Sequence, residues 1–235
     1  MKAMILAAGR GERLRPLTDK TPKPMLPVDG KPLLERHIER LAAIGIEYIV
    51  INTCWLGEQI EAYFSDHGRR FGVNISWSRE IEALETGGGI SRALPLLGDE
   101  PFLLINGDVW SDFPLAELSE INMHEGLDAQ LVLVDNPHHH PQGDFSMQGN
   151  LVSYEDGQRF TFSGISLIRP ALFVAYKNDA GASFPLRDVL RPAIVAGRVG
   201  ASIYTGHWCD VGTVERYQQL DTYIKNRKTV NDRPT

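Results

Sequence analysis

The chain has 235 residues, of which 43% are hydrophobic and 23% charged, a balance typical of a compact α/β domain with a substantial core. Its formal net charge of −6 argues against a general nucleic-acid-binding protein, because nothing in the sequence indicates a broad basic face. No apolar run approaches the roughly 20 residues of a membrane span, and the N-terminus lacks a signal-peptide pattern, so we expect no membrane partner. The two cysteines, Cys54 and Cys209, do not suggest a disulfide framework, and we expect a reduced, cytoplasmic protein.

Predicted strands and helices alternate through the first half of the chain. A short apolar run predicts a buried strand at 2–8, ended by Gly9. Later apolar runs and helical spacings predict, in chain order, a helix at 32–44, a strand at 48–52, a helix at 56–65, a strand at 73–78, a helix at 88–96 and a strand at 101–105. This alternation indicates a Rossmann-like α/β fold with a mostly parallel mixed central sheet flanked by helices.

The second half has a less regular pattern. It predicts strands at 129–134 and 161–168, a weaker hairpin candidate at 150–154, a helix at 184–196, a strand at 201–204 and a terminal helix at 214–227. We assign residues 1–225 to one domain and expect the polar tail 226–235 to be disordered. No hexapeptide repeat is present, which argues against an attached parallel β-helix.

A basic, glycine-containing loop follows the first strand and reads LAAGRGERLRPLTDKTPKP from Leu6 to Pro24. From Met1 to Lys23, six basic residues accompany two acidic ones, so an acidic chain has a local excess of positive charge here. Glycine loops expose backbone N–H groups that can wrap phosphate oxygens, and Arg13 and Lys23 could neutralise those oxygens. The pattern indicates a small anionic ligand, with a simple turn and solvated charges as the alternative.

Two common phosphate-binding motifs do not fit this loop. The dinucleotide fingerprint GxGxxG would need a glycine at position 14, which is Leu14, and Pro16 interrupts an immediate long helix. The P-loop pattern fails as well, since no GK[ST] follows.

The stretch resembles the signature of the sugar-1-phosphate nucleotidyltransferases, LAAG-x-G-x-R-L-x-P-L-T-x-x-x-P-K-P, and every fixed position of that pattern is present. The resemblance covers nearly the whole chain, and it implies a single nucleotide-diphospho-sugar transferase domain whose loop holds a nucleoside triphosphate. It also implies catalytic roles for Arg13 and Lys23 on the phosphates. The loop residues implied to bind the nucleotide are Ala8, Gly9, Gly11, Glu12, Arg13 and Lys23.

Two aspartates are candidates for holding a metal ion. Asp108, in INGDVW, lies just beyond a core strand, where ligands of open α/β sheets bind, and Asp210, in HWCDVGT, precedes the terminal helix. A lone aspartate at a strand end is more often a cap, but the metal aspartates of the family match these two. The resemblance therefore implies Mg²⁺ as the cofactor, with waters and phosphate oxygens completing its shell. It also implies a catalytic role for Asp108 and contacts from Asn106 to both nucleotide and sugar.

The segment EALETGGGI is a candidate for reading the base. Three glycines let a flat base approach the backbone closely, and similar enzymes read a pyrimidine at positions matching Glu82 and Gly87. An ionised Glu82 could accept the N3–H of uracil, whereas cytosine presents an acceptor there. The alternative is a turn that caps the helix predicted from Gly88.

The sugar side rests on NPHHHPQGDF and TFSGI, which match segments lining the sugar pocket in relatives. The residues carried over are Gly143, Asp144 and Gly164. The histidines at 138–140 suggest a metal site, but three consecutive residues cannot easily face one ion, so we interpret them as a polar loop.

The chain departs from the family in one respect. Many pyrophosphorylases carry a Glu-Lys pair after the sugar-binding strand, with the lysine on the sugar phosphate. Between positions 145 and 162 this chain has no lysine, only Arg159. Another cation must hold that phosphate, and the candidates are Lys23, Arg15 and Arg187.

Within the family, LETGGGI, NGDVW, FSGIS and GHWCDVGT are most similar to short bacterial uridylyltransferases. The resemblance implies Mg²⁺-dependent uridylyl transfer from UTP to N-acetyl-α-muramate 1-phosphate, in peptidoglycan recycling, by a monomer or small homo-oligomer. The alternatives are glucose-1-phosphate, mannose-1-phosphate or phosphocholine nucleotidyltransferases using UTP, GTP or CTP, and a nucleotide-sensing regulatory subunit without activity. A dehydrogenase is disfavoured by Leu14, and a sensor by the joint presence of Arg13, Lys23, Asp108 and Asp210.

Overall fold

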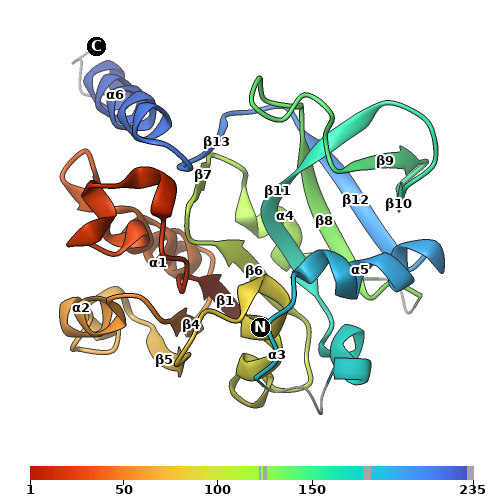
Figure 1. Cartoon of the computed structure of the whole chain (residues 1–235), viewed down its shortest axis with the longest axis horizontal. Helices are drawn as coiled ribbons and strands as arrows, with labels where there is room; N and C mark the ends of the chain where they lie inside the picture. The colour runs from red at the N-terminus through yellow and green to blue at the C-terminus, as the bar shows by residue number, and fades with distance from the viewer. Residues whose placement is uncertain (122, 124–125, 177–180, 232–235) are drawn as a thin grey trace.

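One mixed sheet runs through the molecule in the computed structural model, which describes residues 1–121, 123, 126–176 and 181–231 (Figure 1). Within this part of the chain the sheet has nine strands in the order β5-β4-β1-β6-β11-β8-β12-β10-β9. In chain order the strands are β1 (Lys2–Leu6), β4 (Tyr48–Thr53), β5 (Asn74–Arg79), β6 (Phe102–Asn106), β8 (Ala129–Val134), β9 (Phe145–Gln148), β10 (Leu151–Ser153), β11 (Arg159–Ile168) and β12 (Val199–Tyr204).

Parallel pairing is concentrated in the first half of the sheet. The strands β5, β4, β1 and β6 are parallel neighbours, as are β8 and β12. The long strand β11 lies antiparallel between β6 and β8, and its first residues also pair with β9, so the second half of the sheet curls. The predicted mixed sheet flanked by helices is confirmed, with its parallel part on the side of the N-terminal loop.

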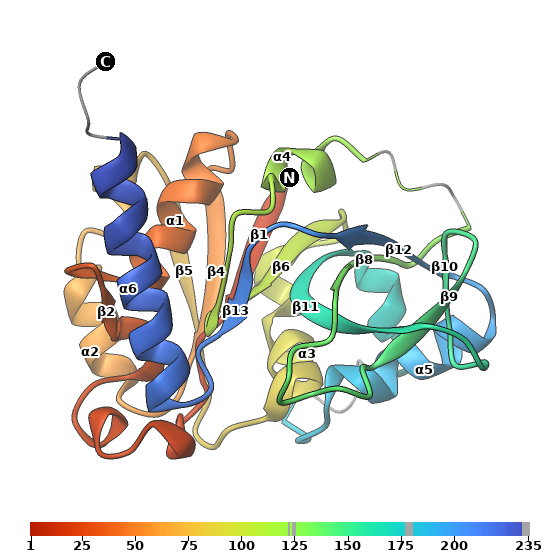
Figure 2. The ribbon, with the colours of Figure 1, turned by 90° about the horizontal axis from the view of Figure 1, so that it is seen from above.

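Helices cover both faces of this sheet (Figure 2). On one face, α3 (Glu85–Leu97) and α5 (Leu186–Val195) pack with Met4 and other sheet residues. On the other face, α1 (Leu33–Ala43), α2 (Gly57–Tyr63) and α4 (Leu115–Ser119) pack with Ala3 and Ile5. Alternating side chains of one strand therefore enter two cores, which is why the strands read as continuous apolar runs.

The C-terminal helix returns to the N-terminal half of the chain. α6 (Val214–Asn231) places Leu220 and Ile224 in a third apolar cluster with Leu14, Leu33, Trp110 and others. Two polar contacts add to this docking: the Tyr217 hydroxyl donates to the Pro27 carbonyl at 2.6 Å, and Asp221 accepts from the Asp29 N–H at 2.6 Å. Apolar and polar contacts thus hold α6 beside the short strands β2 (Pro27–Val28) and β3 (Lys31–Pro32).

Most predicted elements are present, with shifted ends. The first strand ends at Leu6 rather than at position 8, and α3 begins at Glu85 instead of Gly88. The helix α6 continues to Asn231, past the predicted end at position 227. Positions 232–235 lie outside the described residues, so the disordered tail and the domain division at 225 stay predictions. Two three-residue strands, β7 (Val109–Ser111) and β13 (Trp208–Asp210), are absent from the prediction because so short a segment has no readable period.

Among the described residues, no helix combines the length and the apolar character needed to cross a membrane.

Replacing Leu220 by Ala tests the docking of α6. Leu220 is 1% exposed, so its truncation leaves a cavity in the third cluster and should lower the free energy of unfolding by about 2–4 kcal/mol in urea titrations. The exposed neighbour Gln218→Ala serves as the control and should change it by less than about 0.5 kcal/mol. Equal effects of the two variants would contradict the proposed anchoring.

Candidate functional site

A pocket of about 220 Å³ opens where β1 and β6 end side by side. Parallel strands bring the loops that follow them to the same edge of the sheet, which is where ligands of open α/β folds bind. The N–H of Gly107 donates to the carbonyl of Leu6 at 2.8 Å, and a Cβ on Gly107 would lie 2.6 Å from that oxygen. Four segments line the pocket, and the lining residues are Leu6, Ala7, Ala8, Gly9, Gly11, Lys23, Pro24, Asn52, Glu80, Ala83, Glu85, Thr86, Asn106, Gly107 and Asp108.

The loop after β1 has a shape that suits a phosphate. Gly11 adopts a left-handed φ of 68°, and a Cβ there would lie 3.0 Å from the Thr18 methyl and 3.1 Å from Lys23 Cβ. The Thr18 hydroxyl donates to the Gly11 carbonyl at 2.8 Å and folds the loop back onto itself. Within the described part of the chain, the N–H groups of Arg10, Gly11 and Glu12 donate to no protein acceptor, which leaves them available to an anion.

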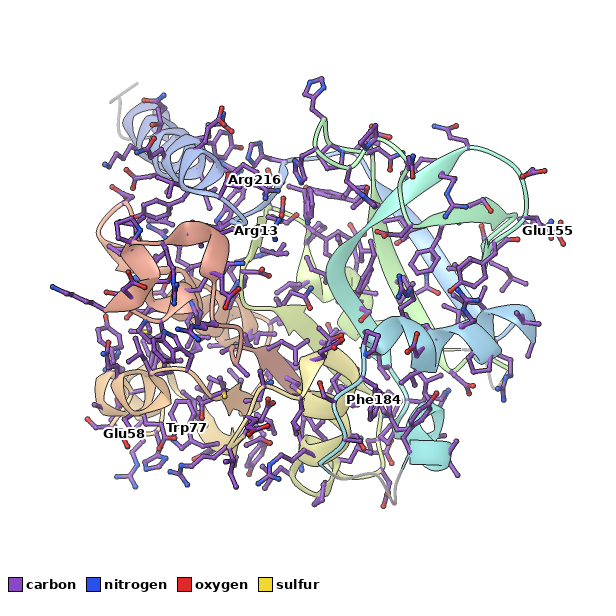
Figure 3. All side chains as sticks on the ribbon, viewed as in Figure 1. Arg13, Glu58, Trp77, Glu155, Phe184 and Arg216 are labelled. Carbon is purple, nitrogen blue, oxygen red and sulfur yellow. The ribbon has the colours of Figure 1, made fainter. Side chains whose placement is uncertain are left out.

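Arg13 and Glu12 lie outside the lining of this pocket. Both are exposed on the short 3-10 helix η1 (Glu12–Leu14), where buried Leu14 anchors the turn. Figure 3 labels Arg13 on this segment. The nucleotide-binding roles of Arg13 and Glu12 stay predictions.

Lys23 and Asp108 are in direct contact. Lys23, in the 3-10 helix η3 (Lys23–Met25), is only 8% exposed, and its Nζ forms an ion pair with Asp108 Oδ2. Behind this loop, burial lowers the pKa of His37 to about 3, so the ring is neutral at physiological pH and adds no charge. The buried ammonium of Lys23 is thus the cation that faces the pocket beside Asp108.

A two-stranded ribbon brings Asp210 next to Asp108. β13 pairs antiparallel with β7, which sets Asp210 opposite Val109, and the Val211 N–H donates to the Asp108 carbonyl at 2.7 Å. More than a hundred residues separate these aspartates in the sequence. The ribbon, which no sequence period predicts, brings the two aspartates to neighbouring backbone positions, and their joint role in holding a metal ion stays a prediction.

An arginine and a histidine lie against Asp210. Arg216 Nη1, at the start of α6, lies 2.5 Å from Asp210 Oδ1, and His139 Nε2 lies 3.0 Å from the same oxygen (Figure 3 labels Arg216). Among the described residues, no group of three or more His, Cys, Asp or Glu could hold a metal ion, so the histidine run does not form one. Carboxylate oxygens are the ligands that Mg²⁺ takes together with waters and phosphate oxygens, but each aspartate is paired with a cation in the structure, so a Mg²⁺ site here stays a prediction.

The carboxylate at the bottom of the pocket is that of Glu80, whereas the predicted Glu82 lies outside the pocket. Glu80 is 7% exposed and accepts from Asn52 Nδ2 at 2.7 Å and from the Leu84 N–H at 3.0 Å. The oxygen of the same Asn52 amide, Oδ1, accepts from the Ala7 N–H at 2.8 Å, which ties this pair to the phosphate loop. Glu82 is exposed and does not line the pocket, so its contact with a base stays a prediction.

The three glycines of α3 are packing positions. The N–H groups of Gly87 and Gly88 donate to the Phe184 carbonyl at 2.9 and 3.1 Å, and a Cβ on Gly87 would lie 2.5 Å from the Phe184 ring. In Figure 3, Phe184 lies on the segment that leads into α5. The glycines let this segment dock against α3, and a base-binding role for Gly87 stays a prediction.

A second pocket of about 680 Å³ continues from the first and shares Glu85, Thr86 and Asn106 with it. Two of the predicted sugar-binding residues, Gly143 and Asp144, line it. The remaining lining residues are His140, Phe145, Tyr154, Arg159, Phe162, Pro185, Leu186, Arg187, Leu190 and Arg191. The shared residues make the two pockets one continuous site with a junction near Asn106.

Hydrogen bonds hold the wall around Asp144. Its Oδ2 accepts from the Phe162 N–H at 2.8 Å, and its Oδ1 lies 3.1 Å from His140 Nε2. The Arg159 guanidinium donates to the carbonyls of Gln142 and Asp144 at 3.1 and 2.6 Å. Arg159 therefore stabilises this loop and also lines the second pocket.

Gly164 supports Asn106 from behind. It lies in a bulge of β11 between Phe162 and Ser166, has a φ of 79°, and would place a Cβ 2.7 Å from Asn106 Nδ2. Gly164 does not itself line either pocket. The structure thus places it against the junction residue, and a direct sugar contact stays a prediction.

The Nucleotidyl transferase family profile matches residues 2–146. The chain belongs to the nucleotidyl transferase family. It is 49% identical over 225 residues to the N-acetylmuramate α-1-phosphate uridylyltransferase of Neisseria meningitidis, covering 93% of this chain and 96% of that protein. It is also 32% identical to the mannose-1-phosphate guanylyltransferase catalytic subunit β of Xenopus tropicalis, over 90% of this chain but only 61% of that protein's length.

Two solved structures share this nucleotidyl transferase fold. A candidate glucose-1-phosphate thymidylyltransferase from Bacillus anthracis superposes with a TM-score of 0.86 at 22% identity, covering 96% of each chain. HddC from Yersinia pseudotuberculosis superposes with a TM-score of 0.77 at 24% identity, over 95% of this chain and 99% of that one. At these identities the likeness shows the fold.

Several residues of this nucleotidyl transferase site lack a signal in the sequence. Asn52 lies in β4 and Glu80 directly follows β5, and only the parallel pairing of these two strands brings the two side chains together. Arg191 is absent from the prediction, and its four-residue spacing from the predicted Arg187, on one face of a helix, is the signal that could have marked it. Arg15, a candidate for the sugar phosphate, instead pairs with Asp19 at 3.1 Å on the exposed loop.

Replacing Gly164 by Ala tests the junction. The new Cβ would press on Asn106, so kcat/KM should fall about tenfold or more in an assay of nucleotidyl transfer, because small displacements of positioning groups are costly. Gly149→Ala is the matched control, since Gly149 has a φ of 59° with nothing within 4 Å of the added Cβ. Both variants should lose stability from the left-handed backbone, and a parallel loss of activity in both would contradict the role of Asn106.

Proposed function

We propose that the protein transfers the uridylyl group of UTP to N-acetyl-α-muramate 1-phosphate, giving UDP-N-acetylmuramate and pyrophosphate. The observation that carries this proposal is the 49% identity, over nearly the full length of both chains, to the uridylyltransferase of Neisseria meningitidis. The junction of two pockets at Asn106 supports it, because a nucleotide and an acceptor sugar phosphate need adjoining sites. Such an enzyme returns N-acetylmuramate to the UDP-linked pool in peptidoglycan recycling.

The reaction needs no nucleophile from the protein. A phosphate oxygen of the acceptor attacks the α-phosphorus of UTP in line, one P–O bond forms, and the bond to the β-phosphate breaks to release pyrophosphate. Burial raises the pKa of the Cys209 thiol to about 11, with the neighbouring Asp210 adding to the shift, so this thiol is un-ionised at neutral pH. Catalysis then consists of positioning and charge neutralisation.

The residues of the first pocket suit these two tasks. The N–H groups around Gly11 would hold the phosphates of UTP, and the buried ammonium of Lys23 would offset the charge that grows on the leaving pyrophosphate. Asp108 and Asp210 would hold Mg²⁺, which supplies further neutralisation of the phosphate oxygens when bound. Lys23 now pairs with Asp108, so its ammonium lies beside the carboxylate of the proposed metal site.

Other activities in the same family are the nearest alternatives. These alternatives keep the mechanism and change the base or the sugar. They are suggested by the 32% identical guanylyltransferase of Xenopus tropicalis and a 30% identical UTP–glucose-1-phosphate uridylyltransferase of Synechocystis. A regulatory subunit without activity is disfavoured, since Lys23, Asp108 and Asp210 lie together. Because UTP is a cytoplasmic metabolite, we also propose a cytoplasmic enzyme that works as a monomer or small homo-oligomer.

Pyrophosphate release over a matrix of nucleoside triphosphates and sugar 1-phosphates tests the proposal. Release should be greatest with UTP and N-acetylmuramate 1-phosphate, and chelation of Mg²⁺ should end it. Preference for GTP with mannose 1-phosphate, or for UTP with glucose 1-phosphate, would move the enzyme to an alternative activity. Release from no pair would favour the regulatory subunit.

Asp108→Asn and Lys23→Ala should each lower kcat by more than about a hundredfold, the scale of losing a major electrostatic contact. The matched controls are Asp99→Asn and Lys20→Ala, which remove the same charges at exposed positions outside both pockets. Urea titration should accompany the kinetics, because breaking a buried ion pair also destabilises the fold. Near-normal turnover in both folded site variants would overturn the mechanism.

A further inference from the structure

The second pocket is lined by more arginines than carboxylates. Three guanidinium groups, those of Arg159, Arg187 and Arg191, line it, against the carboxylates of Glu85 and Asp144. Asp144 is already engaged by the Phe162 N–H and by His140. The guanidinium groups exceed the carboxylates by one positive charge, so the pocket suits an anionic acceptor better than a neutral one.

Two of the arginines lie on one face of α5. Arg187 is in the first turn of the helix, where a cation is disfavoured by the helix dipole, and Arg191 follows one turn later. The Leu186 N–H donates to Thr86 Oγ1 at 2.8 Å, so the start of α5 lies at the junction of the two pockets. Arg191 is therefore about 6 Å further along the helix axis from the junction than Arg187.

Arg191 rests on an aromatic ring. Its guanidinium carbon lies 5.4 Å from the centroid of the Tyr154 ring, and the Tyr154 hydroxyl oxygen is buried. Burial raises the pKa of Tyr154, while the charges of Arg191, Arg187 and Arg159 act in the opposite direction, which indicates that all three guanidinium groups lie near this hydroxyl. A planar cation over a ring with a hydroxyl beside it is suited to bidentate binding of a carboxylate.

The wall that carries these arginines is held in place. Pro192 cannot donate to the Asp188 carbonyl, one turn earlier in α5, and the Tyr176 hydroxyl donates to that carbonyl instead at 3.3 Å. The Tyr176 ring stacks on Phe184 with centroids 4.8 Å apart, and Phe184 is bound through its carbonyl to α3. The spacing between Arg191 and the junction is therefore set by packing.

We propose that Arg191 and Tyr154 form a subsite for a carboxylate on the acceptor sugar, separate from the place of its phosphate at the junction. This inference rests on the proposed transfer to a sugar 1-phosphate, and it narrows the acceptor to one with a second anionic group. The lactyl ether of N-acetylmuramate carries such a carboxylate. Arg187, between the two anions, contributes to both.

Paired acceptors that differ only in this charge test the subsite. The full-length protein is assayed with UTP and N-acetylmuramate 1-phosphate, its carboxyl methyl ester, and N-acetylglucosamine 1-phosphate. Glucuronate 1-phosphate and glucose 1-phosphate form a second pair. The wild type should prefer the acid over the ester by about tenfold or more in kcat/KM, the range of a hydrogen bond to a charged group.

Arg191→Gln should remove that preference, with a larger effect on KM for the acid than on kcat. Arg191→Lys should keep part of the preference, because it retains the charge but not the planar fork. Arg198→Gln is the control, since Arg198 pairs with Asp128 at 3.4 Å outside the pocket. Arg191 is exposed, so its substitution should leave the fold intact.

The outcomes separate this subsite from the proposed function. An unchanged preference in Arg191→Gln, with normal use of N-acetylmuramate 1-phosphate, would overturn the subsite and keep the function. A wild type that prefers glucuronate 1-phosphate, with the preference lost in Arg191→Gln, would keep the subsite and overturn the muramate assignment. If no acceptor reacts, calorimetric binding of the acid and the ester gives the same comparison, and equal affinities would overturn the subsite.

Discussion

The close approach of Gly107 to Leu6 is the constraint on which the rest of the site depends. A Cβ on Gly107 would lie 2.6 Å from the Leu6 carbonyl oxygen, so any other residue would force the ends of β1 and β6 apart. With glycine there, the loop that carries Lys23 and the loop that carries Asp108 face each other across one pocket. The two loops come from distant parts of the sequence, and the parallel register of their strands decides that they meet.

Electrostatic pairing organises the site in the absence of substrate. Lys23 pairs with Asp108 and Arg216 pairs with Asp210, so each carboxylate is balanced by a cation. Because the ion pairs are only partly buried, replacing them with contacts to a metal ion and to phosphates would cost little free energy. The groups that form these ion pairs are also those proposed to act on the triphosphate.

The fold could be predicted from the sequence where a period or an apolar run is long, and the site where one continuous motif carries it. The strand β1 and its glycine loop, including Gly11 and Lys23, follow from local pattern alone. The pairing of Glu80 with Asn52 and the ribbon that joins Asp210 to Asp108 depend on strand register, which no local pattern encodes. The start of α3 was misplaced because glycine disfavours helices, and the docking of Phe184 outweighs that preference.

The ribbon of β7 and β13 also bears on the order in which the protein becomes competent. The glycine loop, Lys23 and Asp108 all leave the ribosome before Asp210, which lies 25 residues from the end of the 235-residue chain. A nascent chain that has folded its strands up to β6 would therefore contain the glycine loop, but of the two carboxylates proposed to hold a metal ion it would contain only that of Asp108. Binding of nucleotide would then precede catalysis, because β13 adds Asp210, the second proposed metal ligand, only after these segments, as α6 adds its contacts to the N-terminal cluster.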